Sequence, residues 1–107
     1  MVDFLGMMKK AEELQARMGE MQDRLGELVV EGRSGGGLVT VSLSGRFELK
    51  GIRIDASLMQ PGEASILEDL IVAAHADAKG KAEAEAARRM QELTAGLPLP
   101  PGMKLPF

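Results

Sequence analysis

Residues 28–54 read LVVEGRSGGGLVTVSLSGRFELKGIRI, and their pattern indicates the fold most clearly. Apolar and polar residues alternate within it, most clearly where Val39, Val41 and Leu43 are separated by polar neighbours. Alternation with a period of two predicts strands, and the run of three glycines and the later single glycine predict turns. The sequence therefore predicts an antiparallel meander of three strands, at residues 28–34, 38–44 and 46–55.

The third predicted strand shifts its pattern midway. Phe47 and Leu49 occupy odd positions, whereas Ile52 and Ile54 occupy even ones. Because side chains alternate strictly between the two faces of a strand, one face holds all four only if one residue is inserted. We therefore predict a β-bulge at Gly51. A sheet of three strands also leaves two edges open, which favours pairing with a second chain.

A long helix is predicted before the sheet, over residues 3–26. Its apolar residues recur at steps of three and four, which is the heptad pattern of a helix that packs along one partner helix. The residues of this apolar stripe are Phe4, Met7, Ala11, Leu14, Met18, Met21, Leu25 and Leu28. At 1.5 Å per residue this helix is about 36 Å long.

A second long helix is predicted over residues 62–94. Bulky residues near its start suit the apolar face of the sheet, and its Ala-rich remainder suits close packing along the first helix. Gly96 and Pro98 end it. Residues 97–107 contain too many prolines for a helix, so we expect an extended tail whose Leu, Met and Phe residues suggest docking. The chain is thus predicted to be one α+β domain, residues 1–96, followed by this proline-rich C-terminal tail.

Composition excludes several classes of function. The chain has no Cys, which excludes disulfides, thiolate metal sites and thiol chemistry. Its start lacks the pattern of a signal peptide and no apolar run is long enough to span a bilayer, so we expect a cytoplasmic protein without a membrane partner. The net charge of −3 argues against the simplest, strongly basic kind of nucleic-acid binder.

The sequence also lacks a pattern of catalytic residues. His75 is the only histidine, and its position within an Ala-rich helical run favours a packed or surface role. Adjacent carboxylates such as Glu12 and Glu13 point apart on a helix instead of converging on a substrate. The three glycines precede a strand and not a helix, so they do not form a phosphate loop. We expect no enzyme activity, cofactor, metal or small-molecule substrate.

Four segments of the chain carry a family resemblance. They are EGRSGGGLV at 31–39, IRIDASL at 52–58, LEDLIVAA at 67–74 and LPLPPGMKLPF at 97–107. Taken in this order they resemble the YbaB/EbfC family of bacterial nucleoid-associated proteins. The resemblance implies a tweezer-like homodimer in the cytoplasm, in which sheets join the subunits and long helices project as arms. It also implies DNA binding with weak or no sequence preference at the nucleoid, contributing to nucleoid organisation, with gene regulation as a further option.

A mildly acidic chain must gather its cations locally to bind duplex DNA. If the two helices pack antiparallel, the start of the first lies beside the end of the second, which brings Lys9 and Lys10 next to Arg88 and Arg89 at the arm tip. A symmetric dimer doubles this set. Secondary candidates on the same helices are Arg17, Arg24, Lys79 and Lys81. We expect weak, salt-sensitive contacts to phosphate, with a Kd of about 10⁻⁴–10⁻⁶ M.

An alternative interpretation stays open. The ordinary role of each single Lys or Arg on such a helix is a solvated surface. The chain could instead be a protein-interaction module whose heptad arms bind a partner protein, with DNA contact incidental. The acidic net charge favours this alternative.

Overall fold

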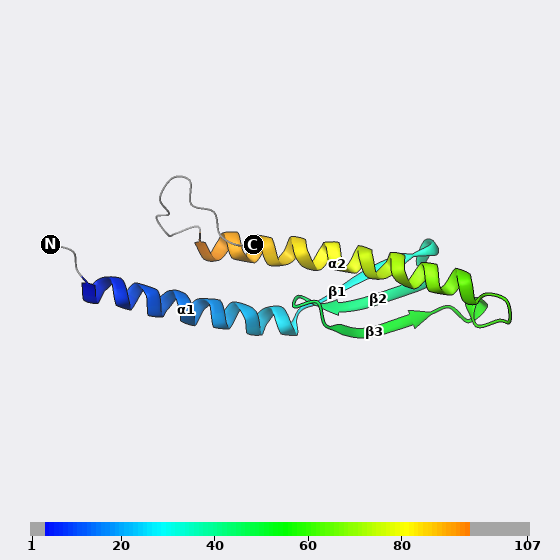
Figure 1. Ribbon diagram of the computed structural model, residues 1–107, viewed down its shortest axis with the longest axis horizontal. Helices are drawn as coiled ribbons and strands as arrows, with labels where there is room; N and C mark the ends of the chain where they lie inside the picture. The colour runs from blue at the N-terminus through cyan, green and yellow to red at the C-terminus, as the bar shows by residue number, and fades with distance from the viewer. Residues whose placement is uncertain (1–3, 95–107) are drawn as a thin grey trace.

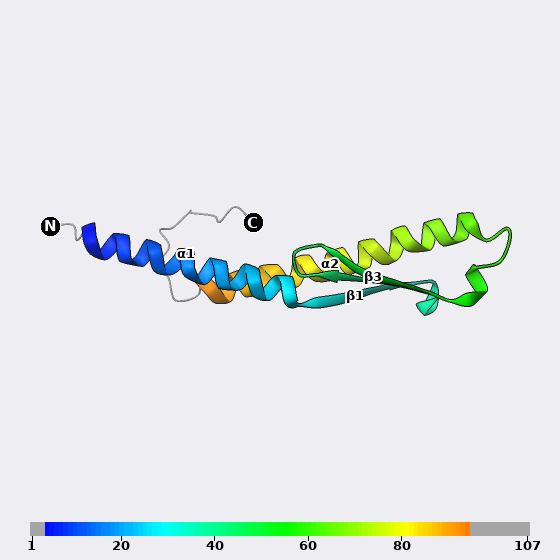
Figure 2. The same ribbon diagram turned by 90° about the horizontal axis from the view of Figure 1, so that it is seen from below.

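Two long helices flank a three-stranded sheet in an elongated molecule (Figures 1 and 2). The structure is a computed structural model in which residues 4–94 are described. It confirms the predicted α+β helix–sheet–helix order, whereas the expected tail at 97–107 lies outside the described residues. The helices are α1 (Phe4–Glu27) and α2 (Ala64–Thr94), and the strands are β1 (Val29–Ser34), β2 (Val39–Ser44) and β3 (Leu49–Ile54). Short 3-10 turns at Gly35–Gly37 and Ala56–Leu58 follow β1 and β3.

The sheet is antiparallel, with β2 at its centre and β1 and β3 at its edges. Ser42 pairs with Gly51 and Leu43 pairs with Leu49, so Lys50 is an extra residue in β3. The predicted bulge is therefore confirmed, one position before Gly51. Because opposite residues of an antiparallel pair point to the same side, the bulge puts Leu49 on the face that Leu43 presents to the core.

The main core forms where α2 packs across β1 and β2. Gly32 of β1 allows the backbone of α2 to come close, because a Cβ at this position would lie 2.2 Å from both the Ala74 oxygen and the Ala78 nitrogen. Ala74 and Ala78 are fully buried. The Ala-rich part of α2 therefore begins against the sheet, and not only against α1 as the sequence suggested. The other buried residues of this core are Val39, Val41, Leu43 and Leu58.

The turn between β2 and β3 holds the end of α1. The Gly45 N–H donates to the carbonyl oxygens of Leu25 (2.8 Å) and Leu28 (3.1 Å). Carbonyl groups at the end of a helix have no partner inside the helix, so this turn satisfies them. A Cβ on Gly45 would lie 2.7 Å from the Leu25 oxygen, which excludes larger residues here. The last turn of α1 is thus fixed to the sheet.

The helices α1 and α2 run antiparallel and meet over only a short length. Met21 and Leu25 of α1 are buried together with Met90 of α2 in a second, smaller cluster. The expected heptad packing is therefore found only in the last part of α1. Toward its start, α1 projects beyond the end of α2 (Figure 1), and its stripe residues Phe4 and Met7 are 69% and 59% exposed.

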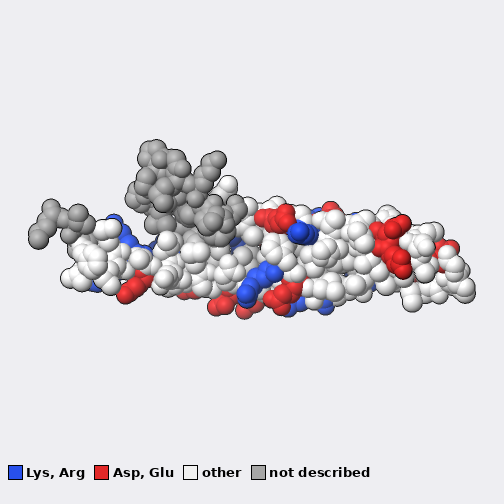
Figure 3. All heavy atoms as spheres, in the orientation of Figure 1, with Lys and Arg blue, Asp and Glu red and all other residues white. Residues whose placement is uncertain are grey.

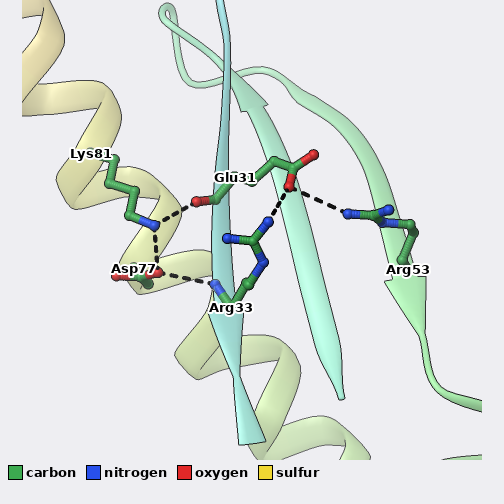
Figure 4. A network of polar contacts seen from close by, with 5 residues as sticks. All are labelled: Glu31, Arg33, Arg53, Asp77 and Lys81. Carbon is green, nitrogen blue, oxygen red and sulfur yellow. Dashed lines mark hydrogen bonds and ion pairs between the residues drawn. The ribbon is translucent and has the colours of Figure 1, made fainter. Parts of the chain in front are cut away.

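The two edges of the sheet differ in how their backbone groups are satisfied. Along β1, the Arg33 N–H donates to Asp77 Oδ2 (3.0 Å), and Lys81 Nζ donates to the Glu31 carbonyl oxygen (2.8 Å; Figure 4). Asp77 and Lys81 also form an ion pair, at 3.2 Å. Two side chains of α2 thus occupy the outer edge of β1, whereas no described residue does so along β3. The sheet has one blocked edge and one open edge.

Candidate nucleic-acid interface

A line of three cations runs along α1 at a spacing of seven residues. Lys10, Arg17 and Arg24 are each two helical turns apart and lie next to the apolar stripe. All three are exposed, as is the neighbouring Lys9. None of these four forms an ion pair with another residue of the described range 4–94. Their charges are therefore available to an anionic partner.

An open cleft of about 350 Å³ lies between α1 and α2 where the two helices part. It brings together three of the predicted site residues, Arg17 and Arg24 from α1 and Arg89 from α2. The other residues that line it are Glu20, Met21, Glu92 and Leu93. Three guanidinium groups share the cleft with two carboxylates, so cations are in a small local excess there.

The cations of α2 are each paired with a carboxylate three or four residues away on the same helix. The pairs and their N···O distances are Lys79–Glu83 (3.9 Å), Lys81–Asp77 (3.2 Å), Arg88–Glu92 (2.5 Å) and Arg89–Glu85 (3.1 Å). Arg88 also contacts Glu85. A phosphate that binds one of these cations must compete with the carboxylate already there. An anion would therefore meet more competition at the predicted residues of α2 than at those of α1.

Glu85 is the centre of the pairing at the end of α2. Hydrogen bonds from Arg88 and then from Arg89 hold the pKa of the Glu85 carboxyl below its usual value. In turn, the hydrogen bond to Glu85 raises the pKa of the Arg88 guanidinium. The Glu85 carboxylate therefore stays ionised to a lower pH than an ordinary glutamate, and both arginines retain their anionic partner there.

The expected cluster of cations at the arm tip does not form, because the two helices pack in a different register. The pairs expected there were Lys9 and Lys10 with Arg88 and Arg89. Packing of Met21 against Met90 sets the register of the two helices and places Arg89 at the cleft with Arg17. Lys10 lies 11 positions before Met21 in α1, roughly 16 Å further along the helix, where α1 extends past the end of α2 (Figure 1). The prediction assumed that the heptad stripe is in contact over its whole length, whereas contact is confined to the part near the sheet.

Three exposed arginines outside the predicted set add to the cations of this surface. Arg33 and Arg53 extend from the face of the sheet that α2 leaves uncovered, and both donate to Glu31 Oε2, at 2.9 and 3.3 Å (Figure 4). Arg46, in the turn after β2, forms no ion pair with any residue of the described part of the chain. The alternation in residues 28–34 could have placed Arg33 on the polar face, but no sequence signal marked Arg46.

The surface is mixed in charge. Figure 3 shows acidic and basic side chains interspersed along the molecule, without a continuous basic face on the side in view. Across residues 4–94, no helix is long and apolar enough to cross a membrane, and no group of three or more His, Cys, Asp or Glu side chains has a metal-binding arrangement. His75 is exposed on α2. A surface of this kind produces a weak long-range field, so any electrostatic binding depends on local groups of cations.

The fold, a small α+β domain with two helical arms of unequal exposure, has counterparts among known proteins. Residues 1–97 match the YbaB/EbfC DNA-binding family. A nucleoid-associated protein of Agrobacterium fabrum is 59% identical over 107 residues, with full coverage of both chains. Nucleoid-associated proteins of Brucella ovis and Brucella melitensis match with the same identity and coverage. The chain therefore belongs to the YbaB/EbfC DNA-binding family, as the resemblance of its four segments indicated.

A solved structure has the same fold. The crystal structure of an uncharacterized protein from Helicobacter pylori matches with a TM-score of 0.73, covering 90% of this chain and 100% of that one. The two sequences are 24% identical. This match supports the helix–sheet–helix architecture and carries no information on function.

Proposed function

We propose that this chain is a nucleoid-associated protein of the cytoplasm that binds duplex DNA as a homodimer, with weak or no sequence preference. The observation that carries the proposal is the line of unpaired cations on α1, Lys10, Arg17 and Arg24, together with Arg89 across the cleft. Membership of a DNA-binding family and the names of its relatives support the same function. The binding contributes to nucleoid organisation.

The geometry of the cation line suits the backbone of a duplex. Lys10 and Arg24 are 14 positions apart in α1, which is about 21 Å along the helix. This length corresponds to roughly six base pairs at 3.4 Å per step. Long, exposed side chains at intervals of about 10 Å reach phosphates but present no fixed set of donors to base edges. The site therefore favours binding that depends on salt and little on sequence.

The test is a titration of labelled duplex DNA at several salt concentrations with two matched double variants. Arg17→Ala with Arg24→Ala removes two unpaired cations of α1, and Lys79→Ala with Arg88→Ala removes two paired cations of α2. We expect the α1 variant to bind more weakly and to reduce the slope of log K against log salt by about 0.9 for each phosphate that it no longer neutralises. The α2 variant should retain most of the wild-type slope. Equal effects of the two variants, or wild-type binding that salt does not change, would overturn the proposal.

The homodimer is proposed to form through β3. The edge of β1 is occupied by Asp77 and Lys81, so β3 provides the open edge. Leu49 and Ile52 of this strand are 58% and 41% exposed, although they point to the same side as the core. α2 covers β1 and β2 and leaves this apolar strip uncovered. Pairing with β3 of a second copy would satisfy the open edge and bury the apolar strip, because open edges and exposed apolar residues favour strand pairing.

Sedimentation at micromolar concentration tests the assembly. The wild type should have about twice the chain mass of 11.4 kDa. Ile52→Asp should give a folded monomer, because it places a charge in the proposed interface. Val72→Asp is the matched control, since Val72 is an exposed apolar residue of α2 away from β3 and its variant should stay dimeric. A monomeric wild type refutes the dimer, and a dimeric Ile52→Asp variant refutes the assignment to β3.

One observation favours the second candidate function, a protein-interaction module. The start of α1 exposes apolar residues, Phe4 and Met7 among them, that no DNA backbone would contact favourably. On this alternative the arms bind a partner protein. The salt titration separates the two functions, because absent or salt-independent DNA binding would support the protein partner.

A further inference from the structure

The first three turns of α1 expose an apolar surface that the described residues leave uncovered. Phe4, Leu5, Met7 and Met8 are between 47% and 72% exposed. The stripe becomes half-buried only at Leu14, near the level where α2 ends. Isolated apolar residues on a surface are ordinary, but a contiguous group of this size on one helix end indicates an interaction site.

The chain itself continues from the place where this surface begins. α2 ends at Thr94, and the register set by Met21 and Met90 puts this end opposite the middle of α1. The two helices are antiparallel (Figure 1), so a chain that continued straight on from α2 would run along α1 toward Phe4. Residues 95–107 follow at this point.

The composition of residues 95–107 suits such a partner. Their large apolar residues fall at alternate positions, Leu97, Leu99, Met103, Leu105 and Phe107. The interspersed prolines restrict the free chain, so less entropy is lost when it binds. Thirteen residues extend up to about 40 Å at 3.1 Å per residue, and the uncovered part of α1 is only about 15 Å long. The segment is therefore long enough.

We propose that residues 95–107 bind along the exposed apolar stripe of α1 in the same chain, from Leu14 to Phe4. The short connection from Thr94 gives the segment a high effective concentration at this surface, which favours it over a segment from another molecule. Lys104, the only charged residue of the segment, is complementary to Glu12 and Glu13 of α1, which form no ion pair with any described residue. The segment would thus cover the part of the α1 stripe that lies beyond the end of α2, as an extended chain instead of a helix.

This proposal is independent of DNA binding. It uses the apolar a and d positions of α1, whereas the proposed phosphate contacts use the cations beside them. Docking of the segment would order the far part of the arm without covering Arg17, Arg24 or the cleft they share with Arg89.

The absence of Cys from the chain allows a direct test with one introduced thiol. A nitroxide is attached to Gly102→Cys, and the methyl signals of Met7, Met8 and Leu14 are recorded by NMR. We expect these signals to be lost when label and methyl groups are in the same chain. In a mixed sample, with the label on one population and isotopes on the other, the signals should persist. Persistence of the signals in the same-chain sample, or an equal loss of the signals in the mixed sample, would overturn the proposal.

A second measurement uses hydrogen exchange of the α1 amides from Phe4 to Leu14. Leu99→Ser with Leu105→Ser should accelerate exchange of these amides, and Gly102→Ser should leave it unchanged. Unchanged exchange in the double variant would contradict the proposal. Protection that depends on protein concentration, and not on the segment, would show that a second copy covers this surface instead.

Discussion

The helices α1 and α2 each carry four Lys or Arg residues, but their side chains have different partners. The buried face of α2 packs on the sheet through Ala74 and Ala78, and its four cations pair with carboxylates of the same helix. α1 is buried only at its end, through Met21 and Leu25, and its cations have no ion-pair partner in residues 4–94. A helix whose groups are satisfied within the chain serves the fold. A helix that leaves both charges and apolar residues exposed is where an external partner should be sought.

The largest effect is expected from a substitution that separates α2 from the sheet. In Gly32→Ala the new methyl group would overlap the backbone of α2 at Ala74 and Ala78. Both groups in this contact are backbone, so β1 and α2 can separate only if the core between them repacks. We expect a loss of about 3 kcal/mol in the free energy of unfolding. Urea denaturation followed by circular dichroism measures it.

Gly80→Ala is the control for this substitution. Gly80 lies in α2, and a Cβ added there would meet no atom within 4 Å, so its replacement should stabilise the helix by about 1 kcal/mol. If Gly32→Ala were as well tolerated as Gly80→Ala, the close contact between α2 and β1 would not exist in solution.

Two side-chain truncations, one near each end of α1, test how far this helix is packed. Leu25 is 3% exposed and joins α1 to α2 and to the β2–β3 turn, so Leu25→Ala should cost about 2–3 kcal/mol. Met7→Ala, at the exposed end, should change the free energy of unfolding by less than about 0.5 kcal/mol. Thermal and urea unfolding of both variants provide the measurement, and similar losses would mean that α1 is packed along its whole length.

The elements themselves could be predicted from the sequence, because their patterns are local. The change from heptad spacing to alternation at Leu28 locates the end of α1, and the shift between Leu49 and Ile52 locates the bulge. The register of the arms could not be predicted in this way. The heptad stripe continues to Phe4, and only the joint at Gly45 and the Met21–Met90 contact determine which part of it meets α2.

The candidate site was also only partly predictable. Arg17, Arg24 and Arg89 all belong to the predicted set, but that they line one cleft depends on the arm register, which the sequence does not give. Sequence spacing does not separate paired from unpaired cations either, since Glu20 and Arg24 have the same four-residue spacing as Glu85 and Arg89. Such pairs contribute only a few tenths of a kcal/mol, so neighbouring groups decide which of them form.

A smaller effect follows from releasing the paired cations of α2. Glu85→Gln leaves Arg89 without its carboxylate and Arg88 with Glu92 alone. We expect tighter DNA binding and a salt slope that steepens by about 0.9 for each additional phosphate neutralised. Glu68→Gln is the control, because it changes the net charge equally at a residue outside the α2 ion pairs. Equal effects of the two variants would attribute the gain to net charge alone.

The smallest effect is expected from pH, at the blocked edge of the sheet. The Arg33 N–H and then Lys81 hold the pKa of the Asp77 carboxyl below its ordinary value of 3.8. Because the pKa is lower in the folded state, this group stabilises the fold above pH 3.8, and the contribution is lost as pH falls through the lowered value. The difference in melting temperature between wild type and Asp77→Asn should therefore be present at neutral pH and shrink as the pH falls below 3.8. A difference that is independent of pH would argue against the bond to Arg33.

The hydrogen bonds of Gly45 give the arm a mechanical joint. Its N–H donates to the carbonyl groups of Leu25, in the last turn of α1, and of Leu28, just after the helix, and a side chain cannot be accommodated there. A force applied near Phe4 acts at the far end of a helix about 36 Å long, and the helix is held at its other end by this amide. The chemical shift of the Gly45 amide proton should therefore report the bending of the arm when a ligand binds many residues away.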